Sequence, residues 1–153
     1  MKLRWMRDTD AAPLADVFYR AVREGPSPYS EEQRQAWMAA LPEEERFAQR
    51  LASYFVAVAC ENGTPVGFIA ANAEGYVDLA FILPQARHRG LFRKLYAMIE
   101  SRLLLSEVTR VWTHASLTAE PAFAAVGFSV IQRETVERAG VGLQRAEMEK
   151  HLK

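Results

Sequence analysis

Arg87-His88-Arg89-Gly90 stands between a strand-like run over residues 76–83 and a helix-like run over residues 91–105. We interpret this stretch as a strand, a short basic turn and a helix. The first N–H groups of such a helix have no partner inside it, and they lie at the positive end of its dipole. Together with three basic side chains and the flexible Gly90, they favour a phosphate or pyrophosphate. The sequence therefore predicts a site for a phosphorylated cofactor.

Composition and charge exclude several classes of protein. The chain has 153 residues, half of them hydrophobic, which predicts a single domain over residues 1–153 with a sizeable core. Nineteen basic residues balance nineteen acidic ones, so no net charge would draw the protein to nucleic acid or to a membrane. No apolar stretch reaches membrane-spanning length. The one cysteine, Cys60, cannot form an internal disulfide, so we expect a buried thiol in a cytoplasmic protein.

The first fifty residues are expected to form one strand and three helices. Residues 2–7 alternate polar and apolar side chains, as a strand does. Residues 14–22 then carry apolar side chains at helical spacing. Ser30 with Gln33 is the pattern of a capping box at the start of a second helix, and Pro42, followed by three glutamates, starts a third.

The rest of the chain alternates strand-like and helix-like segments. The expected strands are residues 54–60, 66–71, 76–83, 110–115, 128–137 and 141–148, and the expected helices are residues 91–105 and 119–126. Asn62-Gly63 predicts a hairpin, so the second to fourth strands should form an antiparallel meander. The chain lacks the repeated strand–helix–strand units and the G-x-G-x-x-G or Gly-Lys-Ser/Thr motifs of nucleotide-binding folds. We expect a mixed α/β domain.

Four segments in this order resemble the GNAT superfamily of acyl-CoA-dependent N-acyltransferases, in its small, stand-alone bacterial form. The family signature Gln/Arg-x-x-Gly-x-Gly/Ala follows the fourth strand, and here it reads Arg87-His88-Arg89-Gly90-Leu91-Phe92, preceded by Ile82-Leu83-Pro84. Residues 115–119, residues 123–128 and the pattern Tyr29-Ser30-x-x-Gln33-x-x-Ala36-Trp37 are similar to other family segments. The resemblance implies a mixed, mostly antiparallel central sheet with helices on both faces.

The resemblance also implies acetyl-CoA as the cofactor. Its pantetheine arm would lie along the backbone of Phe81 and Ile82, and its pyrophosphate would accept N–H bonds from the turn Arg89-Gly90-Leu91-Phe92. The implied cofactor-binding residues are Phe81, Ile82, Arg87, His88, Arg89, Gly90, Leu91, Phe92 and Ser116.

Two positions depart from the family pattern. Phe92 replaces a small residue and would crowd the cofactor if its ring pointed outward. We expect the ring to point inward, because Phe92 continues the apolar stripe of Leu95 and Ile99. Phe123 stands where many relatives carry a tyrosine that protonates the CoA thiolate, so another acid, a water or the solvent must act there.

Acyl transfer to an amine needs a base and a donor to the developing oxyanion. Asp78 is the candidate base, because it lies in an apolar strand whose residues Tyr76, Asp78, Ala80 and Ile82 should share a face; a structural ion pair is the alternative. Tyr76 is a candidate donor to the acyl oxygen, although a packed strand aromatic is favoured. Ser116 could bond the pantetheine or the sulfur, or cap the next helix, or do both.

The acceptor is expected to be a primary amine of a small molecule or peptide that attacks acetyl-CoA directly. Tyr29 and Trp37 are candidate substrate-binding aromatics, although Trp37 fits a helix core equally well. His114 is expected to be packed or on the surface, and no spacing of ligands indicates a metal. The alternative function is a non-catalytic acyl-CoA-binding sensor, and the C-terminal hairpin is a candidate surface for homodimerisation.

Overall fold

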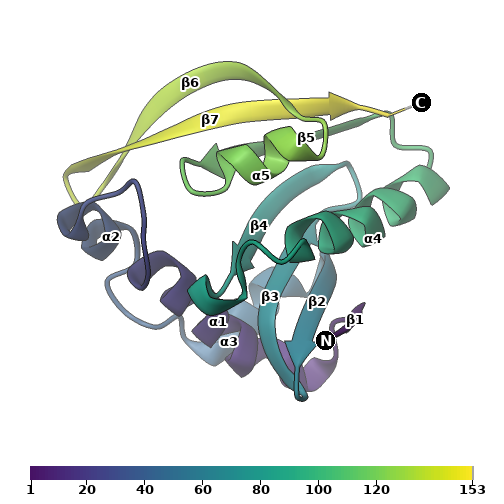
Figure 1. Ribbon diagram of the computed structural model, residues 1–153, viewed down its shortest axis with the longest axis horizontal. Helices are drawn as coiled ribbons and strands as arrows, with labels where there is room; N and C mark the ends of the chain where they lie inside the picture. The colour runs from purple at the N-terminus through teal and green to yellow at the C-terminus, as the bar shows by residue number, and fades with distance from the viewer. Residues whose placement is uncertain (153) are drawn as a thin grey trace.

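A seven-stranded sheet runs through the computed structural model, which describes residues 1–152 (Figure 1). The strands, in the sheet order β1-β2-β3-β4-β5-β7-β6, are β1 (Lys2–Trp5), β2 (Phe55–Glu61), β3 (Thr64–Ala71), β4 (Tyr76–Ile82), β5 (Arg110–Ser116), β7 (Val141–His151) and β6 (Ser129–Arg138). Only β4 and β5 are parallel, and every other neighbouring pair is antiparallel. The expected mostly antiparallel sheet is confirmed.

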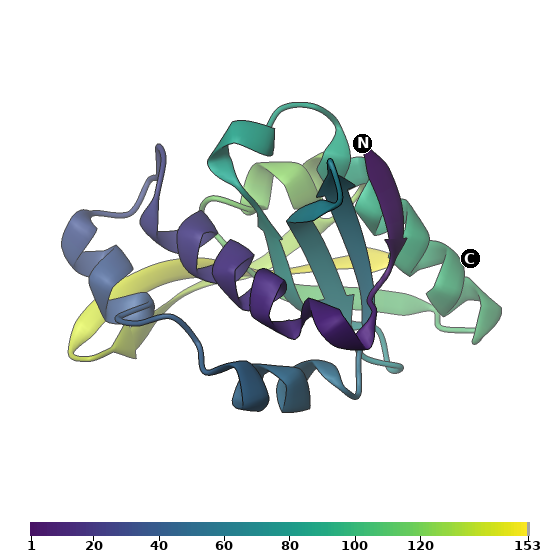
Figure 2. The ribbon, with the colours of Figure 1, turned by 90° about the horizontal axis from the view of Figure 1, so that it is seen from below.

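Helices cover both faces of this sheet, as expected. They are α1 (Ala11–Arg23), α2 (Glu31–Trp37), α3 (Glu44–Leu51), α4 (Leu91–Leu105) and α5 (Glu120–Ala125), with short 3-10 turns η1 (Asp8–Asp10) and η2 (Pro84–Ala86). Figure 2 shows α1 in front of the central strands and α4 behind the sheet; α1 packs mainly against β3 and β4, and α4 against β2 and β3. Because both faces are covered, the residues of β2 and β3 are almost all buried. Cys60, in β2, is a buried free thiol.

Local sequence signals account for the element boundaries. Asn62 and Gly63 both have positive φ, 53° and 81°, which is the geometry of the tight turn expected between β2 and β3. The capping box also forms: Gln33 N–H donates to Ser30 Oγ at 3.1 Å, and Ser30 N–H donates to Gln33 Oε1 at 2.8 Å. The first strand is shorter than expected and ends at Trp5, because Asp10 in η1 accepts the Arg7 N–H at 2.8 Å.

The β4–β5 pair forms a wedge in the middle of the sheet. Tyr76 and Val77 are the only residues of β4 that pair with β5, and the two strands diverge beyond them. Gly75 lies just before that pairing, where its carbonyl accepts the Trp112 N–H at 3.0 Å. A Cβ on Gly75 would lie 2.4 Å from the Arg110 carbonyl oxygen, and the φ of Gly75 is +104°. Only glycine fits the narrow end of the wedge.

A β-bulge interrupts β4 at Asp78. Ala71 pairs with Val77 and Ala70 with Leu79, so Asp78 is the extra residue. Its carboxylate contacts Arg50 on α3, and the Phe81 ring packs 4.5 Å from the Phe18 ring on α1. Strict alternation would put positions 78 and 81 on opposite faces. The expectation that residues 76, 78, 80 and 82 share one face is therefore wrong, because the bulge re-aims the side chain of Asp78.

Candidate active site

The turn between β4 and α4 has the geometry that the sequence predicted. Gly90 is the N-cap residue of α4 in the left-handed conformation, with φ 76°, and His88 also has a positive φ of 63°. A Cβ added to Gly90 would meet no atom within 4 Å. The first backbone N–H groups of α4, from Gly90 to Arg93, have no intrahelical partner. They adjoin a cavity of about 430 Å³ lined by residues that include Ala80, Phe81, Ile82, Arg87, His88, Gly90, Leu91, Phe92, Ser116 and Ala119.

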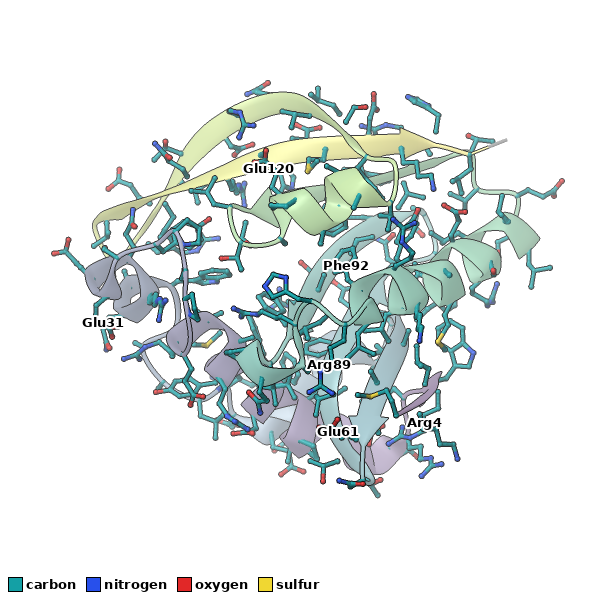
Figure 3. All side chains as sticks on the ribbon, in the orientation of Figure 1. Arg4, Glu31, Glu61, Arg89, Phe92 and Glu120 are labelled. Atoms are coloured by element: carbon teal, nitrogen blue, oxygen red, sulfur yellow. The ribbon has the colours of Figure 1, made fainter. Side chains whose placement is uncertain are left out.

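The two arginine side chains of the turn bind protein groups. The Arg87 guanidinium donates to the carbonyls of Ile82 at 3.0 Å and Ala21 at 2.9 Å. Arg89 forms an ion pair of 2.8 Å with Glu61, and Figure 3 shows the two side chains next to each other. These contacts do not favour the expected binding of phosphate by the Arg87 and Arg89 side chains. The groups of the turn that remain for a ligand are the main-chain N–H groups and His88.

Phe92 packs inward, as expected. Its ring meets the Phe123 ring edge-on at a centroid distance of 4.9 Å, at the start of α4 where Figure 3 labels it. Phe123 is only 1% exposed and also packs against Phe128. Aromatic pairs of this kind hold each other in place. Phe92 lines the cavity, and its ring does not plug it.

A second cavity, of about 480 Å³, lies on the other side of the wedge. Its lining includes Tyr29, Trp37, Arg50, Tyr76, Asp78, Thr113, His114, Val136, Arg138, Leu143, Gln144 and Arg145. Five residues line both cavities: Trp37, Ala80, Phe81, Ser116 and Ala119. The two spaces therefore meet beside the open edge of β4. We call them the turn cavity and the hairpin cavity.

Asp78 lies in the hairpin cavity, with its carboxylate already engaged. Oδ2 accepts from Arg50 Nε at 3.0 Å and from the Tyr54 hydroxyl at 2.9 Å. The side chain is 18% exposed. Burial and the hydrogen bond to Asp78 raise the pKa of Tyr54. No hydrogen bond from the described residues reaches Oδ1, so this oxygen is the one that remains for a substrate.

Tyr76 and His114 form a hydrogen-bonded pair in the same cavity. The Tyr76 hydroxyl lies 2.8 Å from His114 Nδ1, and His114 Nε2 lies 3.9 Å from Glu134 Oε1. In the tautomer with its proton on Nε2, Nδ1 accepts the hydrogen of the Tyr76 hydroxyl. Burial raises the pKa of Tyr76, so its hydroxyl is neutral at pH 7.

The remaining candidates also lie in the lining. Ser116 Oγ accepts the Ala119 N–H at 3.1 Å in the turn before α5, and Ser116 borders both cavities. The N-cap residue of α5 is Ala119, without a side-chain capping bond, so the expected capping role of Ser116 is wrong. Tyr29 donates to the Gln144 carbonyl at 2.5 Å and accepts the Leu117 N–H at 2.9 Å, so its hydroxyl links the segment before α2 to β7. Trp37 meets Tyr29 edge-on at 5.7 Å. The structure brings these candidates together with Asp78 and Tyr76.

His114, Glu134 and Glu147 place one ligand atom each within 4.8 Å of one another. Such a group could hold a metal ion. However, Glu134 is 2.9 Å from Arg145 and Glu147 is 4.0 Å from Arg110, so arginines already balance both carboxylates. We assign no metal to these residues.

Among the described residues, no helix has the length and hydropathy needed to cross a membrane.

The comparison with protein families settles what this fold and site belong to. The family model of the acetyltransferase (GNAT) domain matches residues 26–152. This range includes most of the residues that line the two cavities. The chain belongs to the GNAT acetyltransferase family. The resemblance drawn from the turn motif is thereby confirmed, and the protein is an acetyltransferase by family.

Individual relatives agree with that assignment. The chain is 33% identical to the uncharacterized N-acetyltransferase YafP of Escherichia coli (strain K12), over 92% of this chain and 89% of YafP. A GCN5-related N-acetyltransferase structure from Rhodopseudomonas palustris matches with a TM-score of 0.90 and 30% identity, covering 99% of this chain and 95% of that one. A phosphinothricin acetyltransferase from Sinorhizobium meliloti, solved with AcCoA, matches at a TM-score of 0.77 and 20% identity, over 99% and 88% of the two chains. At that identity the likeness shows the fold alone.

Sequence reasoning missed several polar residues of the hairpin cavity. His114 was expected to be packed or on the surface, yet it lines the cavity and binds Tyr76. Arg50 lies 28 positions before its partner Asp78 in the sequence, and no local sequence pattern predicts that the two side chains pair. For Arg138 a signal existed: Glu134, Val136 and Arg138 alternate along β6, which puts them on one face.

Proposed function

We propose that the protein transfers the acetyl group of acetyl-CoA to a primary amine of a small molecule or peptide by direct attack. The observation that carries this proposal is the meeting of the two cavities at the open edge of β4. One cavity presents main-chain donors, as a CoA pyrophosphate and pantetheine require. The other presents titratable side chains, as an amine nucleophile requires. Phe81 and Ser116 border both, so a thioester at that point is open to an amine from the hairpin cavity.

The turn cavity fits the implied co-substrate in its donor set. The N–H groups at the start of α4 point a positive dipole at the space beside Gly90, where a diphosphate would be stabilised. Beyond Val77, β4 has no strand partner on its β5 side, so its amides and carbonyls there can pair with the amides of a pantetheine arm. The bound co-substrate supplies the acetyl group as a thioester.

Two routes are present for the proton that the amine must lose. In the first, Asp78 Oδ1 accepts it while Arg50 and Tyr54 hold the other oxygen in place. In the second, the Tyr76 oxygen accepts the amine proton as the Tyr76 hydroxyl hydrogen passes to His114 Nδ1. The nitrogen–carbon bond forms, the carbon–sulfur bond breaks, and the thiolate takes a proton from the solvent. We favour the second route, because the Asp78 carboxylate is already held by Arg50 and Tyr54, whereas the Tyr76 hydroxyl faces a proton acceptor at His114 Nδ1.

Binding and turnover test the two halves of this proposal separately. Acetyl-CoA at about a hundred times its dissociation constant should add roughly 2.7 kcal/mol to the stability of the native state, and ATP and NAD at the same concentration should add much less. Release of free thiol over a panel of primary amines then reports transfer. Stabilisation without thiol release from any amine would support the sensor and overturn the enzymatic proposal.

The variant Asp78→Asn separates the two proton routes. If Asp78 is the base, turnover falls at least a hundredfold while acetyl-CoA affinity is preserved. If Asp78 positions Arg50 and Tyr54, turnover falls much less and Tyr76→Phe carries the larger loss. Asp16→Asn is the matched control, because Asp16 lies on α1, pairs with Arg20 and borders neither cavity.

A further inference from the structure

We propose that the acceptor amine also carries an anionic group, a carboxylate, which Arg138 binds at the far end of the hairpin cavity. This inference rests on the proposed function and names the class of its second substrate. It follows from the charges of the cavity lining, from the position of Arg138 on the β6–β7 hairpin, and from the chemistry of the opposite end of the cavity.

The lining of the hairpin cavity carries unbalanced positive charge. Its arginines are Arg50, Arg138 and Arg145, and its one carboxylate is Asp78. Arg50 is paired with Asp78 at 2.9 Å, and Arg145 is paired with Glu134, just outside the lining, at 2.9 Å. Among residues 1–152, no acidic group lies within 4.0 Å of the Arg138 guanidinium; its one hydrogen bond, of 3.4 Å, goes to the carbonyl of the adjacent Glu137.

The pairing of β6 with β7 places Arg138 in the lining of the hairpin cavity. Val136 pairs with Leu143 and Glu134 with Arg145, so Arg138 shares their face of the hairpin by strand alternation. This end of β7 extends past β5, whose last pair is Ser116 with Arg145. There α2 and the segment before it support β7, through the hydrogen bonds from Gln33 to the Gly142 carbonyl and from Tyr29 to the Gln144 carbonyl.

The opposite end of the cavity suits an amine. Tyr76 and Asp78 lie on β4 next to the point where the cavities meet, and Asp78 attracts an ammonium group. Trp37, Val136 and Leu143 contribute apolar lining. A compound with an ammonium group at one end and a carboxylate at the other complements both ends, since a guanidinium binds a carboxylate through two parallel hydrogen bonds.

Two matched pairs of amines test this inference. L-Phenylalanine is compared with 2-phenylethylamine, and 6-aminohexanoate with pentylamine; within each pair the second compound lacks only the carboxylate. We expect kcat/KM to favour the carboxylate member of at least one pair. In Arg138→Gln that preference should fall about tenfold, mainly through KM, because hydrogen bonds to a charged group are lost far from the reacting atoms. The preference should also weaken as salt is raised, since Arg138 is exposed.

Two further variants test whether the preference for a carboxylate depends on the guanidinium group at position 138. Arg138→Lys keeps the charge but loses the two-pronged geometry, so its preference should lie between those of the wild type and Arg138→Gln. Arg46→Gln removes the same charge from an exposed position on α3 that borders neither cavity, and should leave the preference unchanged.

The outcomes separate this inference from the function on which it rests. If amines are acetylated but the members without a carboxylate are preferred, the inference is overturned and the acetyltransferase proposal stands. The same holds if the preference for a carboxylate survives Arg138→Gln. If no amine of either pair or of the wider panel releases thiol, both are overturned.

Discussion

The turn cavity and the hairpin cavity share five lining residues but are built by different means. In the turn cavity, the polar groups that we propose for binding acetyl-CoA are mainly backbone groups, namely the first N–H groups of α4 and the unpaired edge of β4. Its two arginine side chains, Arg87 and Arg93, donate to backbone carbonyl groups of the protein. In the hairpin cavity the ligand-facing groups are side chains from β4, β5, β6, β7 and α3.

This difference decides how each half of the site can change. A backbone site depends on conformation, so it tolerates most side-chain exchanges and is damaged where a special φ is lost. A side-chain site depends on the identity of each residue and on pairs that are distant in sequence. The effect of a substitution should therefore depend on its cavity. Substitutions at the turn should change the binding of the cofactor, and those in the hairpin cavity should change turnover and the choice of acceptor.

Tyr76→Phe is expected to have the largest effect, and it acts in the hairpin cavity alone. Without the hydroxyl, the link to His114 Nδ1 is lost, so kcat should fall about a hundredfold, as for removal of an acid–base group. The dissociation constant for acetyl-CoA, measured by titration calorimetry, should not change. Tyr19→Phe is the control, because Tyr19 lies on α1 outside both cavities. A Tyr76→Phe enzyme with full kcat would remove Tyr76 from the proton route.

Gly90→Ala is the corresponding test of the turn cavity. Alanine is strained at φ 76°, and its methyl group would occupy space that is free in this structure and open to a ligand. Acetyl-CoA binding should weaken about thirtyfold, with kcat at saturating acetyl-CoA reduced much less.

Gly63→Ala controls for the strain in that experiment. Gly63 has φ 81° and equally free surroundings, but it lies in the β2–β3 turn. Both variants should lose similar stability, so only a difference in acetyl-CoA affinity between them counts as an effect on the site. Equal affinities would contradict the backbone site at the start of α4.

Much of this comparison follows from local sequence. The glycine turn, the capping box of Ser30 and the Asn62-Gly63 hairpin each depend on residues close together in the chain, and each forms as expected. The inward packing of Phe92 also followed from its place in a helical stripe. The turn at the start of α4 was predictable because its conformation depends on one short stretch of sequence.

The hairpin cavity was not predictable in the same way. The bulge at Asp78 leaves no mark in the alternation of β4, and it is a property of the pairing with β3. His114 meets Tyr76 only because β4 and β5 are adjacent in the sheet, 38 residues apart in the chain. Side-chain pairs of this kind are set by tertiary structure, which one sequence does not reveal.

Asp10→Asn changes an ion pair that lies outside both cavities. The Arg4 guanidinium, 2.6 Å away, and the Arg7 N–H hold the pKa of the buried Asp10 below its usual value. The contribution of Asp10 to stability is therefore complete above the unfolded pKa of about 3.9, and it is lost as the pH falls through the lower folded pKa. At pH 7 the variant should be about 1.5 kcal/mol less stable in urea unfolding.

The pH dependence provides the check on Asp10. The difference in stability between the wild type and Asp10→Asn should narrow as the pH falls below about 4. Acetyl-CoA affinity and kcat at 25 °C should match the wild type. A difference in stability that stays constant between pH 7 and pH 3 would contradict the ion pair with Arg4.

Ser116→Ala has the smallest expected effect, and it falls where the two cavities meet. Loss of the bond from Oγ to the Ala119 N–H should cost about 1 kcal/mol of stability. The hydroxyl hydrogen is free to donate toward the sulfur, so we also expect kcat to fall about fivefold. Ser106→Ala, at the end of α4, should lose stability without any loss of kcat. An unchanged kcat in Ser116→Ala would leave Ser116 with only its hydrogen bond in the turn before α5.

The narrow end of the wedge, at Gly75, has a consequence for how such an enzyme can diversify. In the sheet of the described residues, β5, β6 and β7 join the other strands through the two residue pairs of β4 and β5, and Gly75 lies so close to the Arg110 carbonyl that no side chain fits between them. Exchanges on β6 and β7 can therefore accumulate without disturbing β4, along which we propose that acetyl-CoA binds. A lineage could explore new acceptors at little risk to its donor chemistry, provided that one glycine is kept.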